Sequence, residues 1–401
     1  MSDFLNRCRP PHVFTLVIAT SVSALATNVF LPSLPSIARY YQADYAVAQL
    51  MVSIYLAATA LLQLGIGPAS DRFGRRPVML VCLMLFIIGT LTSLWAPTIE
   101  ILLASRILQA FSAAGLVLSR AIVRDTVEAE DAAGRIGYIT MGMALIPMIA
   151  PMIGGILDEI YGWQASFVLM LAFGIAAFLL IFFDLGETNR NISVSMAAQI
   201  RKYPELLGST SFWGYTFIAS FSSGAFFVLI GAGPFVATEI LGLKPSEFGL
   251  YMGFISLGYV GGNFLSGRYS RRIGLNRMIM MGCLSVTAGI CLPYALFAAG
   301  DQDALALFGP LLLVGLGNGM TLPNANAGIV SVRPHLAGSA SGLGGAIQLG
   351  IAAIMSSLAG VIVTEETGIN ALLYLMFSSA MVAVMATWWT ANAASNRKRN
   401  G

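Results

Sequence analysis

The stretch Gly67-Pro-Ala-Ser-Asp71-Arg-Phe-Gly74-Arg-Arg76 decides the fold of this chain, because it separates two long apolar segments while carrying three arginines and one carboxylate. A charged side chain at the centre of a bilayer costs about 2.5–3.5 kcal/mol on insertion scales. The stretch therefore predicts a short, tight loop at a membrane surface. Gly67 and Gly74 supply backbone conformations that are closed to other residues.

The same pattern returns later in the chain as Gly267-Arg-Tyr-Ser-Arg-Arg-Ile-Gly274. Two glycines, a serine and an arginine stand at matching positions in both copies, without a gap. This repeat predicts a chain that is built from two similar halves.

Composition supports a membrane protein. The 401 residues are 57% hydrophobic and only 10% charged, whereas soluble proteins carry about 25% charged residues. Two histidines and four cysteines without CxxC spacing predict neither a metal site nor a disulfide framework. The sequence also lacks Walker A, GxSxG and HExxH motifs, so an enzyme is not expected and ATP is not the expected energy source.

A membrane span needs about 20 apolar residues, and the chain divides into twelve such segments. The predicted spans are residues 11–33, 46–68, 77–96, 100–122, 135–157, 163–183, 212–236, 247–267, 276–298, 304–327, 338–362 and 369–392. The predicted fold is an all-α integral membrane protein with twelve transmembrane helices in two pseudo-symmetric six-helix bundles. The predicted domains are a bundle over 1–183, a cytoplasmic connector over 184–210, and a second bundle with a short basic tail over 211–401.

Charge placement gives the topology. With the N-terminus in the cytoplasm, all but three of the 22 lysines and arginines lie on the cytoplasmic side or in the termini, the exceptions being Arg39, Lys244 and Arg106. Such a bias is what the positive-inside rule predicts. Both termini are therefore expected in the cytoplasm.

Arg106 stands within the fourth predicted span, where it shares a helix face with Gln109. A buried intramembrane charge is a candidate functional site. The 19 carboxylates all lie in loops or at span ends, so no buried acid is predicted to pair with Arg106. The remaining polar candidates within spans are Asn28, Gln63, Asn263, Asn318, Asn324 and Asn326.

The fifth predicted span is unusually rich in helix-perturbing residues, namely Pro147, Pro151, Gly154 and Gly155. Proline removes a backbone hydrogen bond, and paired glycines permit close approach of another helix. We expect this span to bend or to pack very closely against a neighbour.

Together these elements resemble the major facilitator superfamily, and within it the twelve-helix drug:proton antiporters of the bicyclomycin-resistance/chloramphenicol-efflux type. The resemblance covers essentially the whole chain. The stretch GPASDRFGRRPVML looks like the family's motif between helices two and three, with the following residues in place: Gly67, Asp71, Arg72, Gly74, Arg75 and Arg76.

Two further motifs carry the resemblance. LLASRILQAFSAAG looks like the helix-four motif, in which Arg106 and Gln109 match while Ala110 and Ser112 replace usual glycines. The run from Ala150 to Gly155 resembles the antiporter motif of helix five. Other matching stretches are RAIVRDT at 120–126, which contains Asp125, GWQASF at 162–167, GAGPFV at 231–236, RRIG at 271–274 and HLAGSASGL at 335–343.

One position departs from the family pattern. The first helix of this type usually reads Asp-Met-Tyr-Leu-Pro-x-x-Pro, and its aspartate is the expected proton carrier, but this chain has Asn28 there. Asparagine does not titrate. Three explanations stay open: coupling runs through another carboxylate, the protein is not proton-coupled, or the asparagine is an engineered substitution.

The resemblance implies an efflux transporter of the bacterial inner membrane that works by alternating access around a central site. The residues expected at that site are Asn28, Tyr55, Arg106, Gln109, Phe226 and Phe227. The residues expected to form a conformational latch are Gly67, Asp71, Arg72, Gly74, Arg75, Arg76 and Asp125. In the outward-facing state Asp71 is expected to face the N-terminus of the eleventh helix near Gly338, where the helix dipole favours a carboxylate.

The expected substrates are neutral, zwitterionic or weakly anionic amphiphiles, because an arginine without a buried carboxylate repels a lipophilic cation. The expected energy source is a proton gradient, without a cofactor, and the expected partners are the drug-like substrate, protons and lipid. We expect a monomer that binds no nucleic acid. The alternatives are a physiological metabolite exporter, an uncoupled facilitator, or a membrane sensor that does not transport.

Overall fold

The structure, a computed structural model, describes residues 7, 10–126, 129–189, 203–300, 303–333 and 336–400. In the first half of the chain the helices are α1 (Val13–Asn28), the 3-10 turn η1 (Leu31–Ser33), α2 (Leu34–Tyr40), α3 (Tyr45–Phe73), α4 (Arg75–Leu94), α5 (Ile99–Gln109), the 3-10 turn η2 (Ala110–Ser112), α6 (Ala113–Thr126), α7 (Ala129–Tyr161) and α8 (Gln164–Asp184). In the second half they are α10 (Tyr203–Leu207), α11 (Thr210–Phe235), the π-helical turn η3 (Val236–Ile240), α12 (Pro245–Ile273), α13 (Leu275–Ala298), α14 (Ala304–Phe308), α15 (Leu312–Ser331), α16 (Ala337–Ile362) and α17 (Gly368–Asn400).

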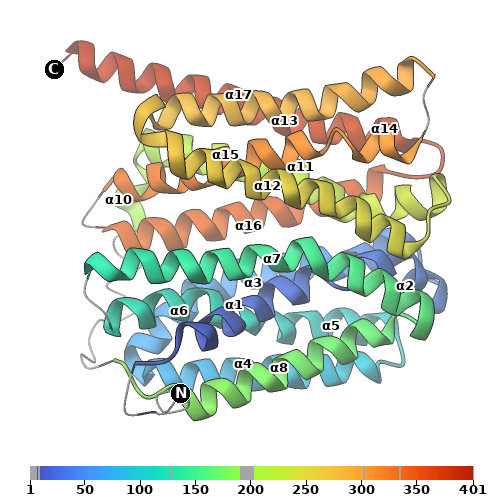
Figure 1. Ribbon diagram of the computed structural model, residues 1–401, viewed down its shortest axis with the longest axis horizontal. Helices are drawn as coiled ribbons and strands as arrows, with labels where there is room; N and C mark the ends of the chain where they lie inside the picture. The colour runs from blue at the N-terminus through green and yellow to red at the C-terminus, as the bar shows by residue number, and fades with distance from the viewer. Residues whose placement is uncertain are drawn as a thin grey trace.

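The helices run roughly along one axis and form two groups, with α1 to α8 below and α11 to α17 above in Figure 1. Within the described residues, ten segments are long and apolar enough to cross a membrane, counting broken segments such as α1 with α2 as one. The long helices α7 and α12 complete the twelve. The predicted fold of twelve membrane helices in two six-helix bundles is confirmed. The domain limits at 183 and 211 stay a prediction, because much of the connector lies outside the described residues.

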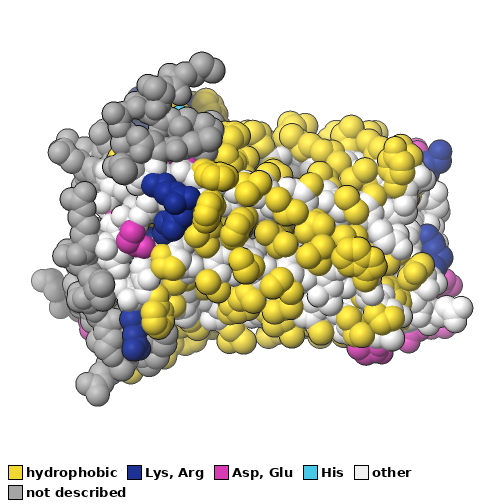
Figure 2. Space-filling view, turned by 90° about the horizontal axis from the view of Figure 1, so that it is seen from below, with side chains coloured by type: hydrophobic (Ala, Val, Ile, Leu, Met, Phe, Trp, Pro, Cys, Tyr) yellow, Lys and Arg dark blue, Asp and Glu magenta, His cyan; other side chains and the backbone are white. Residues whose placement is uncertain are grey.

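The outer surface matches a lipid environment. In Figure 2, hydrophobic side chains cover the middle of the visible face, and charged side chains lie toward the two ends. Leu61 and Val361 are among many large apolar side chains that are more than half exposed. A soluble protein rarely exposes an apolar surface of this extent.

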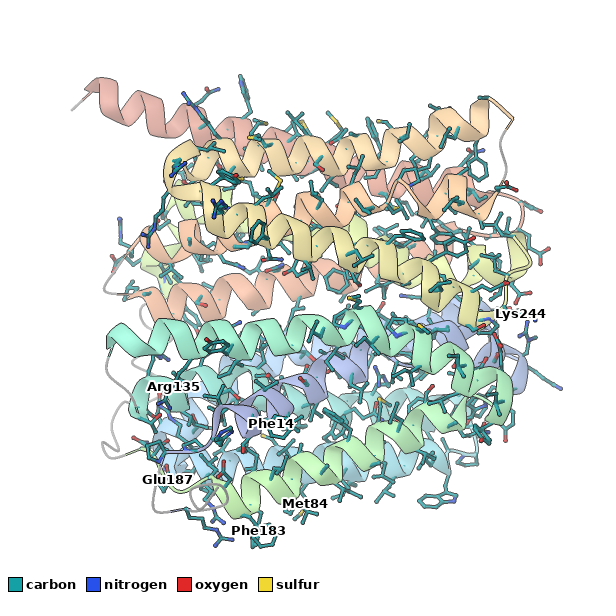
Figure 3. The ribbon with its side chains drawn as sticks, in the orientation of Figure 1. Phe14, Met84, Arg135, Phe183, Glu187 and Lys244 are labelled. Carbon is teal, nitrogen blue, oxygen red and sulfur yellow. The ribbon has the colours of Figure 1, made fainter. Side chains whose placement is uncertain are left out.

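The ends of the bundle differ. Figure 1 marks both chain termini at one end, and Figure 3 places Arg135 and Glu187 there and Lys244 at the opposite end. We name these the terminal end and the distal end. The connections at the distal end include residues 41–44 and 241–244.

The predicted loop over residues 67–76 was wrong. Helix α3 continues to Phe73 and α4 begins at Arg75, so Gly74 alone breaks the helix, with φ of 97°. The matching Gly274 has φ of 92°, which confirms the repeat at the level of the backbone. The 29 residues of α3 span about 43 Å at 1.5 Å per residue. This length exceeds the apolar layer of a bilayer, which is about 30 Å thick. The last turn of α3, which carries Asp71 and Arg72, can therefore remain helical and still lie outside that layer.

Candidate functional site

Arg106 lies in the core of the first half and is 0% exposed. Its guanidinium donates from Nε to the Met51 carbonyl at 3.0 Å and from Nη2 to the Ala26 carbonyl at 2.8 Å. The rings of Phe30 and Tyr55 lie 4.3 Å and 4.6 Å from the guanidinium carbon. The carbonyl oxygens and the aromatic faces thus stabilise the positive charge of Arg106, for which no buried carboxylate partner was predicted.

Gln109 fixes the orientation of Arg106. Its Oε1 accepts from Nη1 of Arg106, and its Nε2 donates to Ser93 Oγ at 2.9 Å. The predicted helix face shared by Arg106 and Gln109 therefore makes a direct contact. Because both side chains are fully buried, they are held in the wall of the first bundle and not on an open surface.

Tyr55 joins three helices of the first half. Its hydroxyl lies 2.9 Å from Ser23 Oγ on α1 and 2.9 Å from Ser112 Oγ on η2, while its ring contacts Arg106. The structure brings Tyr55, Arg106 and Gln109 into one polar cluster. A role for that cluster in binding substrate stays a prediction.

Asn28 is the last residue of α1, which together with η1 and α2 forms one interrupted membrane helix. Its Nδ2 donates to the Ala24 carbonyl at 2.8 Å, whereas its Oδ1 is buried without a hydrogen-bond partner. The side chain is 5% exposed. Leu31-Pro32 follows as a 3-10 turn, because a proline there cannot supply an N–H to a continuing helix.

The aromatic pair Phe226 and Phe227 lies on α11 in the second half. Both rings are partly buried, 5.7 Å apart, and pack against the apolar core of the first half. Ile230, one turn further along, is fully part of that core. The pair therefore lies at the interface between the halves, and its predicted contact with substrate is untested.

At the terminal end, Arg75 connects two carboxylates. It donates from Nη1 to Asp71 and, at 2.6 Å, to Ser70 Oγ, and from Nε to Asp125 Oδ2 at 2.9 Å. The structure thus brings together Asp71, Arg75 and Asp125, which the sequence assigned to a latch. All of these contacts lie within the first half.

Glu187 belongs to the same network but was not predicted. Its carboxylate accepts from the backbone N–H of Arg75 at 2.9 Å and of Arg76 at 3.3 Å, the first two residues of α4. A carboxylate at a helix N-terminus satisfies free donors and complements the helix dipole. Arg76 also donates to the Phe182 carbonyl at 3.1 Å, while Arg72 lies over the ring of Phe73 at the surface.

The glycine pair of α7 packs against backbone on two sides. A Cβ atom on Gly154 would lie 1.7 Å from the Val29 carbonyl oxygen, and one on Gly155 would lie 2.4 Å from the Pro245 carbonyl oxygen. Val29 belongs to the first half and Pro245 begins α12 in the second. No side chain fits at either contact, which explains why the sequence has glycine at both positions.

The two prolines of α7 lie in the same region. Pro147 and Pro151 are inside the helix, and the Pro151 carbonyl lies 2.5 Å from the Cβ position of Gly249 on α12. The predicted close packing of the fifth span is therefore observed, against α12. Its function in antiport stays a prediction.

The two halves meet most closely at the distal end. In the described part of the chain, four hydrogen bonds join the two halves, and we name this set the distal gate. The four bonds are Arg39 Nη1 to Glu239 Oε1 (2.8 Å), Tyr45 Oη to the Gly231 carbonyl (2.9 Å), Gln49 Nε2 to Ser356 Oγ (2.6 Å) and Ser246 N–H to Glu159 Oε1 (2.8 Å). At the terminal end, by contrast, Gly338 and Gly342 on α16 have nothing within 4 Å of their Cβ positions. The interface is closed at the distal end.

Of the remaining polar candidates within spans, Asn326 is exposed, and Asn263 donates to the Tyr259 carbonyl of its own helix at 2.8 Å. Asn318 accepts from Ser222 Oγ at 2.8 Å, and Asn324 donates to Ser266 Oγ at 2.8 Å. Gln63 is different, because its Oε1 lies 3.4 Å from the Cβ position of Gly345 on α16. The sequence did not single out Tyr45 and Gln49, although their spacing of four residues on α3 places them on one helix face.

The comparisons with known proteins agree with this architecture. The family model described as Major Facilitator Superfamily matches residues 16–352. A relative named "Uncharacterized MFS-type transporter YdgK", from Bacillus subtilis, is 31% identical over 382 residues, 93% of each chain. A "Bicyclomycin resistance protein homolog" from Haemophilus influenzae is 28% identical over 395 residues, 96% of this chain and 98% of the relative. The solved D-xylose-proton symporter shares the fold with a TM-score of 0.75 at 14% identity, over 94% of this chain and 96% of that one.

Proposed function

Because the chain belongs to the Major Facilitator Superfamily, we propose that it exports amphiphilic, drug-like compounds across a bacterial inner membrane by alternating access. The observation that carries the proposal is the enclosed polar cluster of Arg106, Gln109 and Tyr55 in a protein whose described hydrogen bonds between the two halves lie at the distal end. Relatives named for bicyclomycin and multidrug resistance support a drug-like substrate. The distribution of basic residues supports a cytoplasmic location of both termini.

The substrate class follows from charge. The described contacts of the Arg106 guanidinium are to carbonyl and amide oxygens and to rings, so its positive charge is not cancelled by a neighbouring carboxylate among them. Bringing a second cation close to this cluster in a low-dielectric interior is unfavourable. Neutral, zwitterionic and weakly anionic compounds are the proposed substrates.

Uptake into inverted-orientation proteoliposomes tests this class. A neutral phenicol-like compound is expected to be transported at least tenfold faster than an isostere that carries a quaternary ammonium group. The measurement is counterflow of radiolabelled compound, with empty liposomes as the blank. Tighter binding of the cation than of its neutral isostere would defeat the proposed substrate class, and transport of neither would defeat the proposed function.

Proton coupling is testable at Asn28. The Asn28 amide donates to the Ala24 carbonyl, and an aspartate can replace that donor only when it is protonated. In Asn28→Asp, addition of a phenicol-like compound is therefore expected to move protons under an imposed pH gradient, with severalfold larger signals from a pH-sensitive dye than in the unsubstituted chain. Equal signals from both proteins would place the coupling group elsewhere, and signals from the variant alone would make the chain as it stands an uncoupled facilitator.

Asp71→Asn is expected to slow transport about fivefold. The substitution removes a charge-assisted hydrogen bond to Arg75, whose value we set at about 1 kcal/mol because the pair is partly exposed. Initial rates of compound uptake measure the effect. The matched control is Glu205→Gln, which breaks the exposed pair with Arg333 in the second half and is expected to leave the rate unchanged. A wild-type rate in Asp71→Asn would exclude the latch.

A further inference from the structure

Asp158 is a buried carboxylate that the proposed function does not use. It lies in the last turn of α7, one turn beyond Gly154 and Gly155, and is 9% exposed. Its Oδ2 accepts from Ser36 Oγ on α2 at 2.8 Å, but its Oδ1 is buried without a hydrogen-bond partner. A buried ionised oxygen without a donor is costly, so this site is poorly suited to the charged carboxylate.

The surroundings of Asp158 can hydrogen-bond both protonation states of the carboxyl group. Ser33 Oγ is fully buried and also lacks a hydrogen-bond partner, and Ser33 is one of the groups that act on the Asp158 carboxyl. A carboxylate offers only acceptors, whereas a carboxylic acid adds an O–H donor that a serine oxygen can accept. Both serine hydroxyls can donate to the carboxylate and so favour the charged form, whereas burial away from water favours the neutral acid. Protonation of Asp158 removes the buried charge, and the new O–H can still bond to the Ser33 oxygen.

The charges around Asp158 point in the same direction. Arg39 from α2 and Glu159 from α7 itself act directly on its carboxyl group. Arg39 is already paired with Glu239, and Lys244 acts on Glu159. Both nearby cations are thus engaged by other carboxylates, so ionised Asp158 adds an unpaired negative charge at the closed distal end, and a proton would remove it.

We propose that Asp158 is a proton-binding site that stabilises the closed distal gate. A proton taken from water on the distal side forms the Oδ1–H bond as the gate shuts, and it returns to water when opening exposes the carboxyl group. A ligand that binds one state better shifts the population toward that state. The inference rests on the proposed function only in requiring that the distal gate opens and closes.

The test measures the gate directly, without substrate. Spin labels are attached at Pro97→Cys in the first half and Glu366→Cys in the second, both at exposed distal positions, with the four native cysteines replaced by alanine. Double electron–electron resonance in lipid nanodiscs then gives the ratio of closed to open gate. We expect this ratio to rise at least threefold as the pH falls from 8 to 5.

The variants separate Asp158 from its neighbours. Asp158→Asn, a neutral mimic of the protonated acid, is expected to stay closed at every pH, and Asp158→Glu is expected to keep a pH response. The matched control is Glu100→Gln, which neutralises an exposed acid at the start of α5 outside the distal gate; it is expected to keep the pH response of the parent. A pH-independent parent, or a pH response that survives in Asp158→Asn, overturns the proposal.

A second measurement needs no folded variant beyond the parent. Infrared difference spectra of the parent between pH 8 and pH 5 are expected to contain the C=O band of a buried carboxylic acid. Absence of that band overturns the proposal even where Asp158→Asn fails to fold. Failure of drug transport with an intact pH-driven gate would refute the proposed function alone, and transport with a pH-insensitive gate would refute the role of Asp158 alone.

Discussion

Arg106→Met is expected to abolish transport and to lower the free energy of unfolding by about 2–6 kcal/mol. The substitution leaves the Met51 and Ala26 carbonyls buried without their donor, at about 1–3 kcal/mol each. It also removes a cation that lies between the rings of Phe30 and Tyr55. Methionine fills a similar volume, so the loss reflects polar contacts and not a cavity.

Thermal unfolding in detergent and uptake into proteoliposomes measure the two effects. The matched control is Ile107→Met, one residue along α5, whose side chain is 50% exposed on the outer surface and is expected to behave as the parent protein. Arg106→Lys keeps the charge but not the planar set of donors, so it is expected to recover part of the stability. A variant Arg106→Met with parental stability and transport would remove Arg106 from the site.

Gly155→Val is expected to hold the distal end open and to reduce transport more than tenfold while the protein remains folded. The added side chain would meet the Pro245 carbonyl oxygen at 2.4 Å and the Ser246 Cα atom at 2.7 Å, both of which are backbone atoms that cannot rotate away. Overpacking of this kind costs about 1–3 kcal/mol or more. Because the contact lies between the halves, the cost falls on closing the interface and not on folding each half.

Spin-label distances across the distal gate report this change. Gly253→Val is the matched control, since Gly253 lies on α12 with nothing within 4 Å of its Cβ position. The control is expected to close and to transport normally. Closure of the distal gate in Gly155→Val at the parental distance would show that the seam can adjust, and the role of this glycine would have to be abandoned.

The fold was predictable because each of its causes is local. Apolar length set the spans, and the returning glycines at 74 and 274 revealed two related halves whose backbones take the same positive φ. The prediction failed where local charge was read as a loop. Helix α3 stays helical through Asp71 because its end extends beyond the apolar layer, where charged residues meet water.

The site was predictable only in part. Arg106 and Gln109 were found because their spacing puts them on one helix face, and the contact is present. Gln49 and Glu187 were missed because their partners lie 307 and 112 residues away in the chain. Such contacts depend on how helices are placed against one another, which hydropathy and spacing do not determine. Asp158 was seen only as an acid at a span end, and its unpaired oxygen became apparent only in the packed structure.

The unbroken course of α3 has a mechanical consequence. One helix carries Tyr45 and Gln49 at the distal gate and Asp71 in the network of Arg75, and a single residue connects it to α4. A rod of this kind behaves as a lever: tilting it about its middle displaces the two ends in opposite directions by similar amounts. Widening the distal seam by a few ångströms would then press Asp71 toward the second half, so that opening on one side and closing on the other become a single movement.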